Sequence, residues 1–504
     1  MPNIKIDGKP YSVKDGITII EALDELGIDL PRYCWHPGLS IAGNCRICQV
    51  EVEKTPRTVI ACNTRVAEGM AVSTKSAKAK ESQQMVLEFL LANHPLDCPV
   101  CDQSGECKLQ DYYMEYGLYD PRFNDVKVKK TKKAFSIGPT IMLDQERCIL
   151  CSRCVRFTDE ITKTHEFGIF NRGDRTEVDV YKPLDNKYSG CVADICPVGA
   201  LTDKDFRFKM RVWYLGSGES VCPGCSRGCN ITIDYEKSRP YHSDKARVMR
   251  LKPRYNRDVN RWWMCDEGRY GYKPIDANRL LIPKAPGTDG LRPVNGNGAY
   301  RTQSGQDELW KEVIAKLALA LKSGRWGLIA SPQYTNEEIG IMDRLFRKGL
   351  GWKDFGFHAP GQEGYEDDFL LKADKNPNTA GAVKAFGLSA KQGDLTPVVE
   401  KAKRGELDGL FVFSHDLSRL MGLEAFNGLR AKLKTLVFEG PNDNVTAATA
   451  DFTLASASYA EKEGSFTNFE GRVQPIRKVL EPLGHARPTA QILSDLAGAL
   501  EIRL

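Results

Sequence analysis

The chain has no cysteine after Cys265, although 16 cysteines lie among its 504 residues. Metal or thiol chemistry is therefore confined to residues 1–265, about the first half of the sequence. Long apolar runs are also missing, since even VLEFLLA at residues 86–92 falls well short of the roughly 20 residues that a membrane-spanning helix needs. We expect a protein that is soluble or, at most, peripheral to a membrane.

A strong excess of one charge is absent as well. Lysine and arginine number 71 against 66 acidic residues, and the net charge of +5 does not favour a nucleic-acid partner. The N-terminal MPNIKIDGKPYSV has neither the apolar core of a secretory signal nor the arginine-rich character of a transit peptide. We expect a protein that stays in a reducing compartment, folded as about three or four domains.

Most cysteines are spaced as metal ligands rather than as disulfide partners. The first set is Cys34, Cys45, Cys48 and Cys62, with the pattern C-x10-C-x2-C-x13-C. Strand-like segments at 4–6, 11–13 and 50–52 and an amphipathic helix at 19–28 follow the order of a small 2Fe-2S ferredoxin. Plant-type proteins use C-x4-C-x2-C, so the long gap indicates a related branch. Gly43 suits a loop that wraps closely around cluster sulfurs.

The second set is His94, Cys98, Cys101 and Cys107, directly after a helix-like segment at 75–93. Three cysteines leave a 4Fe-4S cluster one ligand short, and His94 is the nearest other donor. A neutral imidazole in place of a thiolate should raise the reduction potential, as in Rieske centres. The alternative is that His94 only caps the helix.

The third set begins with Cys148, Cys151 and Cys154 and ends with Cys196, which a proline follows. Bacterial two-cluster ferredoxins repeat C-x2-C-x2-C-x3-C-P, and the last cysteine of each run binds the other cluster. Thr158 stands where the first run needs its fourth cysteine, and the partner positions of the second run hold Asn186, Ser189 and Val192. One 4Fe-4S site remains, and Cys191 lies one residue out of register.

The fourth set is Cys222, Cys225, Cys229 and Cys265. Short strands and loops are expected between its third and fourth members. Structural zinc is the alternative for this set, as it is for the first, where a zinc knuckle would need shorter and more symmetric spacing.

These segments resemble the large iron-sulfur subunit, known as the G subunit, of bacterial NADH:quinone oxidoreductase, respiratory complex I. The resemblance rests on YCWHPGLSIAGNCRICQVEV, HPLDCPVCDQSGECKLQD, RCILCSRCVRF, SGCVADICPVGAL and CPGCSRGCN with CDEGRYGY. It extends more loosely, through residues 450–474, to a molybdopterin-oxidoreductase-like domain whose tail is short for the family.

The resemblance implies an α+β multidomain protein that conducts electrons. Expected are a β-grasp 2Fe-2S ferredoxin domain at 1–76, a 4Fe-4S domain at 77–138, a 4Fe-4S ferredoxin-like domain at 139–215, a 4Fe-4S domain of molybdenum-enzyme type at 216–272 and an α/β domain at 273–504. The implied partners are a flavin and NADH-binding subunit and quinone-side iron-sulfur subunits. The implied location is the peripheral arm, on the cytoplasmic side of the bacterial inner membrane. The fourth cluster would lie off the main electron route, and no molybdenum cofactor, substrate site or catalytic residue is expected.

The cysteine-free half predicts alternating helices and strands, with helices at 307–324 and 336–351 and buried parallel strands at 325–331, 408–414 and 434–440. NGNGAY at 295–300 lacks the full G-x-G-x-x-G pattern and is interpreted as a loop. The Pro/Gly-rich segment 273–298 should lie across the surface. The basic run at 127–135 should be a solvated linker, with docking to an acidic partner as the minority interpretation.

A molybdenum formate dehydrogenase is the main rival, because it carries similar ferredoxin modules. Such enzymes bind their metal through a downstream Cys or selenocysteine, and none follows Cys265, although a Ser ligand stays open. An iron-iron hydrogenase would need further cysteines. Four clusters require sixteen ligands, so if His94 supplies one, a single cysteine of the 16 is left over. Cys191 is that remainder, best interpreted as a small buried hydrophobe.

Overall fold

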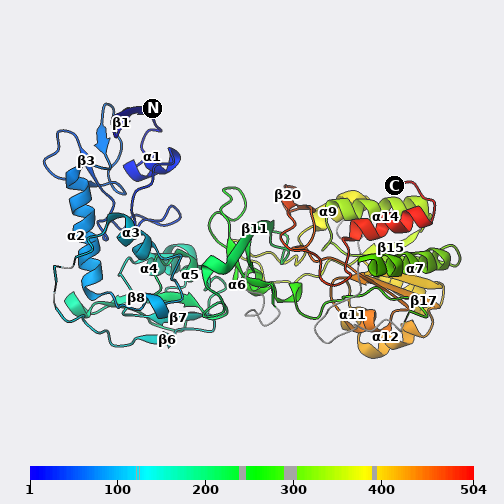
Figure 1. The fold of residues 1–504 in the computed structure, drawn as a ribbon. Coiled ribbons are helices and arrows are strands. Elements are labelled where there is room, and N and C mark those ends of the chain that lie inside the picture. Colours follow the sequence, from blue (N-terminus) through cyan, green and yellow to red (C-terminus); the bar gives the residue numbers. More distant parts are fainter. Residues whose placement is uncertain (121, 124, 238–245, 289–302, 389–393) are drawn as a thin grey trace. The chain divides into compact units, whose positions relative to one another are not determined.

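The computed structural model describes residues 1–120, 122–123, 125–237, 246–288, 303–388 and 394–504, with the side chains of 303–306 left out. Two compact units divide the chain, Met1–Leu215 and Gly216–Leu504. Figure 1 shows the elements of each unit along the chain. The glycine-rich stretch at 295–300 lies outside the described residues.

The first unit begins with a five-stranded sheet in the order β2-β1-β5-β3-β4. Strands β1 (Asn3–Ile6) and β2 (Lys9–Ser12) form a two-residue hairpin at Asp7 and Gly8, both with positive φ, the turn that Asp-Gly favours. The remaining strands are β3 (Gln49–Val52), β4 (Val59–Ile60) and β5 (Ala71–Ser73). Helix α1 (Ile19–Glu25) starts with a capping box at Thr18 and buries its apolar face against the sheet. The β-grasp prediction is confirmed.

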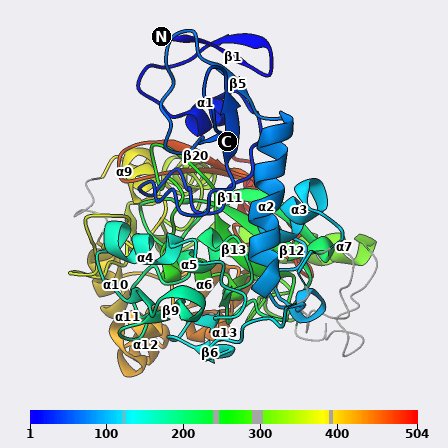
Figure 2. The same ribbon diagram turned by 90° about the vertical axis from the view of Figure 1, so that its left-hand side faces the viewer.

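Two helices follow this sheet. The longer one, α2 (Ala77–Asn93), starts at Ser76, whose hydroxyl accepts from the N–H of Ala79, and α3 (Lys108–Tyr116) lies beside it (Figure 2). A three-stranded sheet, β10-β7-β6, comes next, with β6 (Ala134–Ser136), β7 (Ile141–Asp144) and β10 (Leu201–Asp203). Between β7 and β10 lie α4 (Arg153–Arg156), η2 (Phe157–Ile161), the hairpin of β8 (Phe167–Phe170) and β9 (Glu177–Val180), and α5 (Cys191–Ile195). The cysteine-bearing loops of the first unit connect these elements.

The basic run at 127–135 is bound to the rest of the first unit. Lys127 donates to the carbonyl of Leu91 at 2.7 Å, at the end of α2, where unpaired carbonyls favour a cation. Lys132 pairs with Asp179 at 2.9 Å and Lys133 with Asp97 at 2.7 Å. Residues 129 and 131–134 are exposed, in agreement with the predicted solvated segment, while these ion pairs fasten it to partners far away in the sequence.

The second unit starts with an antiparallel sheet of β11 (Leu215–Val221), β12 (Asn230–Glu236) and β13 (Val248–Pro253), followed by helix α6 (Asp266–Tyr270). Strands β12 and β13 match the strands expected between Cys229 and Cys265. The loop from β11 to β12 and the start of α6 carry the four cysteines of this unit.

The cysteine-free part is a parallel sheet in the order β15-β14-β16-β17-β18. Its strands are β14 (Trp326–Ala330), β15 (Asp354–Phe357), β16 (Gly409–Phe413), β17 (Thr435–Gly440) and β18 (Phe452–Ala455). Along β16, Phe411 and Phe413 belong to one buried cluster while Leu410 and Val412 belong to another. Because alternate side chains point to opposite faces, both faces are covered, and the predicted α/β fold is confirmed.

Helices α7 (Gln303–Leu321), α8 (Asn336–Met342) and α14 (Thr489–Ala499) contribute to the core on one face of this sheet. Helices α10 (Thr396–Lys403), α12 (Leu423–Arg430) and α13 (Val445–Thr449) contribute to the other. Further elements of this part are η6 (Lys273–Ile275), η7 (Asp343–Gly349), α9 (Thr379–Phe386), α11 (Leu417–Met421) and the hairpin of β19 (Gly464–Thr467) and β20 (Val473–Ile476).

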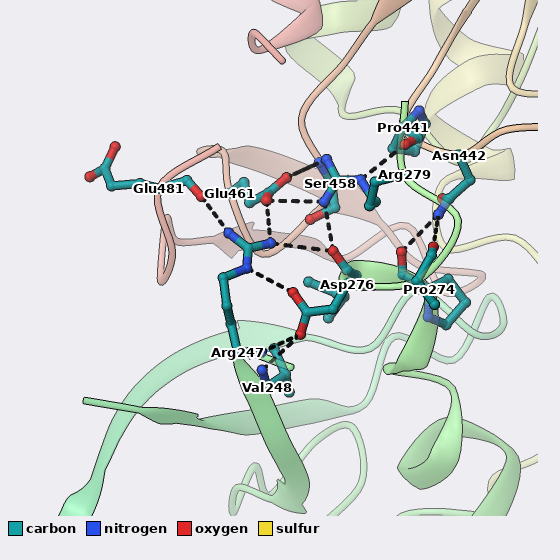
Figure 3. Close-up of polar contacts among 12 residues, drawn as sticks. Arg247, Val248, Pro274, Asp276, Arg279, Pro441, Asn442, Ser458, Glu461 and Glu481 are labelled. Atoms are coloured by element: carbon teal, nitrogen blue, oxygen red, sulfur yellow. Dashed lines mark hydrogen bonds and ion pairs between the residues drawn. The ribbon is translucent and has the colours of Figure 1, made fainter. Parts of the chain in front are cut away.

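The described part of the Pro/Gly-rich segment mixes exposed residues with buried ones, so the prediction that it lies across the surface holds only in part. Arg279 binds Glu461 at 2.8 Å, and both side chains are almost fully buried, at 1% and 0% exposure. Arg247 joins them, with contacts of 2.6 Å to Glu461 and 2.7 Å to Asp276 (Figure 3). Burial alone would raise the pKa of Glu461, but the two arginines hold it below its ordinary value. This network ties β13 to the segment before the parallel sheet.

Candidate iron-sulfur sites

The first cysteine set comes together in the loops around β3 and β4. The thiol of Cys62 hydrogen-bonds those of Cys34 and Cys48, and Cys34 also contacts Cys45. The backbone N–H of Cys34 donates to Cys45 Sγ at 3.4 Å. The hydrogen bonds from its neighbours lower the pKa of Cys34, while the same contacts raise the pKa of Cys62. The fold thus brings the four sulfurs of the first set into contact with one another, as ligation of one cluster requires.

The loop that carries this set turns at two left-handed residues. Gly43 has φ of +64° and Arg46 has φ of +60°. A Cβ on Gly43 would approach Ile60 in β4, so the loop and the sheet lie close together. The prediction that Gly43 serves a closely wrapped loop agrees with this geometry.

In the second set, the structure brings the three cysteines within mutual electrostatic reach. Burial raises the pKa of Cys107 to about 11, and the thiols of Cys101 and Cys98 contribute to the rise. Cys98 is exposed, at the start of the short helix η1 (Cys98–Val100), whereas Cys101 and Cys107 are buried. Cys107 directly precedes α3, whose early N–H groups point toward its sulfur.

His94 ends α2, where its backbone N–H donates to the carbonyl of Leu90. Its imidazole is half-buried, and burial with the nearby Lys127 and Arg147 lowers its pKa to about 4. The side chain is therefore neutral at physiological pH, the form that binds metals. The residue caps the helix with its backbone and leaves the ring available for another role, so ligation by His94 stays a prediction.

The third set lines a single enclosed cavity between α4, α5 and β10. Cys148, Cys151, Cys154 and Cys196 all face it, whereas Cys191, fully buried, is not among its lining residues. Left-handed Leu150 and Ser152 turn the chain between the first three cysteines. The N–H of Leu150 donates to Cys148 Sγ at 3.4 Å. The N–H groups of Val198, Ala200 and Leu201 donate to the sulfur of Cys196. Four thiols around one cavity, with backbone donors to sulfur, fit a 4Fe-4S cluster.

The second and third sets lie against each other. A Cβ on Gly199, three residues after Cys196, would clash with Cys101 Sγ, so only glycine permits this approach. Arg147, which precedes Cys148, donates to Asp97 at 2.9 and 3.0 Å, and Asp97 precedes Cys98. These contacts hold the two ligand loops at a fixed separation.

The fourth set lines a second enclosed cavity, in the other unit. Cys222, Cys225, Cys229 and Cys265 share it with Gly224, Met264, Glu267, Gly268 and Leu370. The N–H of Gly268 donates to Cys265 Sγ at 3.3 Å, and a Cβ on Gly268 would lie 3.0 Å from Cys222 Sγ. This donor set also fits a 4Fe-4S cluster. Among the residues that the structure describes, no group of three or more His, Cys, Asp or Glu is arranged to hold one metal ion.

A cavity of about 260 Å³ opens at the carboxyl ends of β14, β16 and β17. Tyr334, Ser414 and Lys462 line it, with Pro223 and Gly271 from the segment that carries the fourth set. Ligands of doubly wound sheets bind in such a position, where the strand order reverses. The expectation that no molybdenum cofactor is bound stays a prediction.

Family models match four stretches of the chain. They describe a 2Fe-2S iron-sulfur cluster binding domain at residues 2–77, the NADH-ubiquinone oxidoreductase-G iron-sulfur binding region at 83–122, the ferredoxin-like domain of NADH-quinone oxidoreductase subunit 3 at 138–202 and molybdopterin oxidoreductase at 294–499. The mitochondrial 78 kDa subunit of NADH-ubiquinone oxidoreductase from Neurospora crassa is 31% identical, over 99% of this chain and 81% of its own length. The chain belongs to the family of the large iron-sulfur subunits of NADH-quinone oxidoreductase. The NADH-quinone oxidoreductase G subunit from Rickettsia felis is 29% identical, over 100% of this chain and 88% of its own length.

Membership in this family of large iron-sulfur subunits confirms the resemblance found in the sequence. Among solved structures, an NAD+-reducing [NiFe]-hydrogenase is 29% identical with a TM-score of 0.38, over 42% of this chain and 91% of that chain. None of the helices within the described ranges is long and apolar enough to cross a membrane.

Sequence reasoning missed two arginines of α4. Arg153 and Arg156 lie inside the motif RCILCSRCVRF, yet each donates to backbone carbonyls of the loop that starts at Cys34. Their charge inside a cysteine motif was the available signal. Spacing alone did not show that they reach a different ligand set.

Proposed function

We propose that the chain is the iron-sulfur electron-transfer subunit of NADH:quinone oxidoreductase. Its four ligand sets would hold one 2Fe-2S cluster at Cys34, Cys45, Cys48 and Cys62 and three 4Fe-4S clusters at the other three sets, the second completed by His94. The observation that carries the proposal is the gathering of each cysteine set by the fold, in a chain that belongs to this family. Two sets line enclosed cavities with all four cysteines.

In this function the chain itself would hold the clusters, fix the distances between them and influence their reduction potentials. Iron-sulfur clusters supply one-electron chemistry when bound, so no general acid, base or nucleophile is needed. Backbone N–H groups aimed at sulfur stabilise charge on the ligands and so influence the potential. Gly199 and the Arg147–Asp97 contact keep two ligand sets close enough for electrons to pass.

The positions of the ligand sets along the chain suggest its domains, and the family suggests its partners. The five domains would be residues 1–76, 77–138, 139–215, 216–272 and 273–504, the last without a cofactor. The partners would be the flavin and NADH-binding subunit on one side and quinone-side iron-sulfur subunits on the other. The site of action would be the peripheral arm, on the cytoplasmic side of the bacterial inner membrane. The fourth cluster would serve structure rather than the main electron route.

Metal analysis of the anaerobically purified full chain tests this proposal. We expect about 14 iron atoms per chain with matching acid-labile sulfide, and no stoichiometric molybdenum, tungsten or zinc. Electron paramagnetic resonance of the reduced chain should show one 2Fe-2S signal and 4Fe-4S signals. Stoichiometric molybdenum or tungsten would instead support a formate dehydrogenase. Stoichiometric zinc with correspondingly less iron would show that one of the four ligand sets binds zinc in place of a cluster.

A further inference from the structure

One guanidinium joins two ligand loops, at Cys34 and Cys151, that are more than 100 residues apart in the sequence. Nη2 of Arg156 donates to the carbonyl oxygen of Cys34 at 2.5 Å and to that of Cys151 at 3.4 Å. Nη1 of the same side chain donates to the carbonyl of Ser40. A single nitrogen thus lies between a cysteine of the first set and a cysteine of the third.

A second arginine of α4 makes a similar connection, to the residue after Cys34 and to a different segment of the third set. Nη2 of Arg153 donates to the carbonyl of Trp35 at 2.6 Å, and its Nη1 donates to that of Ile195 at 3.0 Å. Trp35 follows Cys34, and Ile195 precedes Cys196. Both arginines therefore connect backbone next to a ligand of one set with backbone next to a ligand of the other.

Further contacts close the same interface between the loops. Asn44 Nδ2 donates to the carbonyl of Leu150 at 3.1 Å, beside Cys45 and Cys151. At the exposed rim, Glu160 accepts the N–H of Ser40 at 2.8 Å. Inside this rim lie the guanidinium groups of the two arginines.

Arginine suits this place for two physical reasons. Its planar fork donates to several acceptors at once, and it stays charged at every physiological pH. Iron-sulfur clusters with thiolate ligands carry net negative charge, and reduction makes that charge more negative. A positive charge beside a cluster therefore favours the reduced state, and the half-buried guanidinium of Arg156 is partly shielded from the water that would weaken this influence.

We propose that Arg156, supported by Arg153, is a positioning residue for electron exchange between the first and third sites. It fixes the Cys34 loop against the Cys151 loop, and its charge raises the reduction potential of both centres. The inference rests on the proposed function. In the exchange, one electron leaves the reduced centre and the oxidised centre gains it; no bond breaks and no proton moves.

The test uses the full chain with its clusters, as wild type, Arg156→Met, Arg156→Lys and the control Arg122→Met. The control removes the same charge from the exposed side chain of Arg122, which pairs with Glu88 in the same unit. Potentiometric titration followed by electron paramagnetic resonance measures both midpoint potentials. Hydrogen exchange at residues 34–40 measures how firmly the loop is held, with and without clusters.

We expect Arg156→Met to lower the potentials of both centres, by about 59 mV for each tenfold loss of preference for the reduced state. Its exchange at 34–40 should quicken even in the chain without clusters. Arg156→Lys should restore most of the potential and little of the loop protection, because it keeps the charge but loses the fork. Potentials and exchange that move no more than in Arg122→Met would overturn the inference. A wild type without the two signals would overturn the proposed function, and the cluster-free exchange data would still decide the positioning role.

Discussion

The first unit and the parallel sheet of the second unit bury different kinds of side chain. In the first unit, a central cluster of buried side chains consists partly of the proposed ligands Cys34, Cys107 and Cys151, packed with Tyr33 and Tyr112. The parallel sheet is enclosed by two clusters without a cysteine, rich in leucine, isoleucine, valine and phenylalanine. The proposed clusters would thus complete the interior around these cysteines, whereas the parallel sheet is enclosed by hydrocarbon side chains alone.

This difference shows how one chain separates stability from redox function. Hydrocarbon burial stabilises a fold at roughly 25 cal/mol per Å² and is independent of the redox state. Iron-thiolate bonds stabilise strongly but tie folding to cluster assembly. The cysteine-free domain can thus serve as a scaffold that stays folded before clusters are inserted.

Removal of iron should have the largest effect, because it should loosen the cysteine loops and leave the parallel sheet intact. Chelation of iron from the full chain should release amides at 45–48, 148–154 and 222–229 to fast hydrogen exchange, since structural metals contribute on the order of 10 kcal/mol. The amides of β14, β16 and β17 should stay protected. Equal loss of protection in those three strands would show that the parallel sheet also depends on iron.

The pair Cys191 and Cys196 sharpens the comparison at one site. Replacing Cys196 with Ser should abolish or convert the resonance signal of the third cluster, because its sulfur faces the cavity. Cys191→Ser, the matched change five positions away, should keep the signal. The reverse outcome would make Cys191 the ligand and reopen the count that assigns His94.

The buried charge network of the second unit should be sensitive to one substitution. Glu461→Gln removes the carboxylate that binds Arg247 and Arg279, leaving two cations short of a partner, and should cost about 3–5 kcal/mol of stability. Thermal unfolding of the second unit should shift down, while the cluster signals of the first unit persist. Glu481→Gln, at an exposed side chain, is the control and should change little. An equal shift for both variants would contradict the argument.

The smallest expected effect is a pH dependence that arises within the parallel sheet. Burial raises the pKa of Glu439 from 4.5 to about 7, although Thr489 and Tyr334 donate to its carboxyl group. Because the folded pKa exceeds the unfolded one, this stability contribution is complete below about pH 4.5 and is lost as pH rises through 7. The loss should approach roughly 3 kcal/mol.

Urea unfolding at several pH values measures this effect. Glu439→Gln should flatten the stability profile across that interval, while Glu312→Gln, at a partly exposed ion pair, should leave it unchanged. If the unfolding free energy of the wild type did not change with pH between the two pKa values, Glu439 would not contribute to a pH dependence.

Much of the fold could be predicted from local patterns. The helix expected at 75–93 is observed at 77–93, and the strand expected at 408–414 at 409–413, because apolar periodicity and caps act over a few residues. Charged segments were predicted less well. Lys132 and Arg279 find partners 47 and 182 residues away, and no local sequence pattern indicates either pair.

The sequence by itself determined the ligand chemistry: four cysteine-rich sets, the register that leaves Cys191 aside, and the restriction of all thiols to the first half. These properties reside in spacing along the chain, which any conformation preserves. Only the tertiary structure decided which thiols share a cavity, why Gly199 can lie against Cys101, and that Arg156 connects two sites across 122 residues. Such contacts depend on packing between distant segments, which spacing cannot encode.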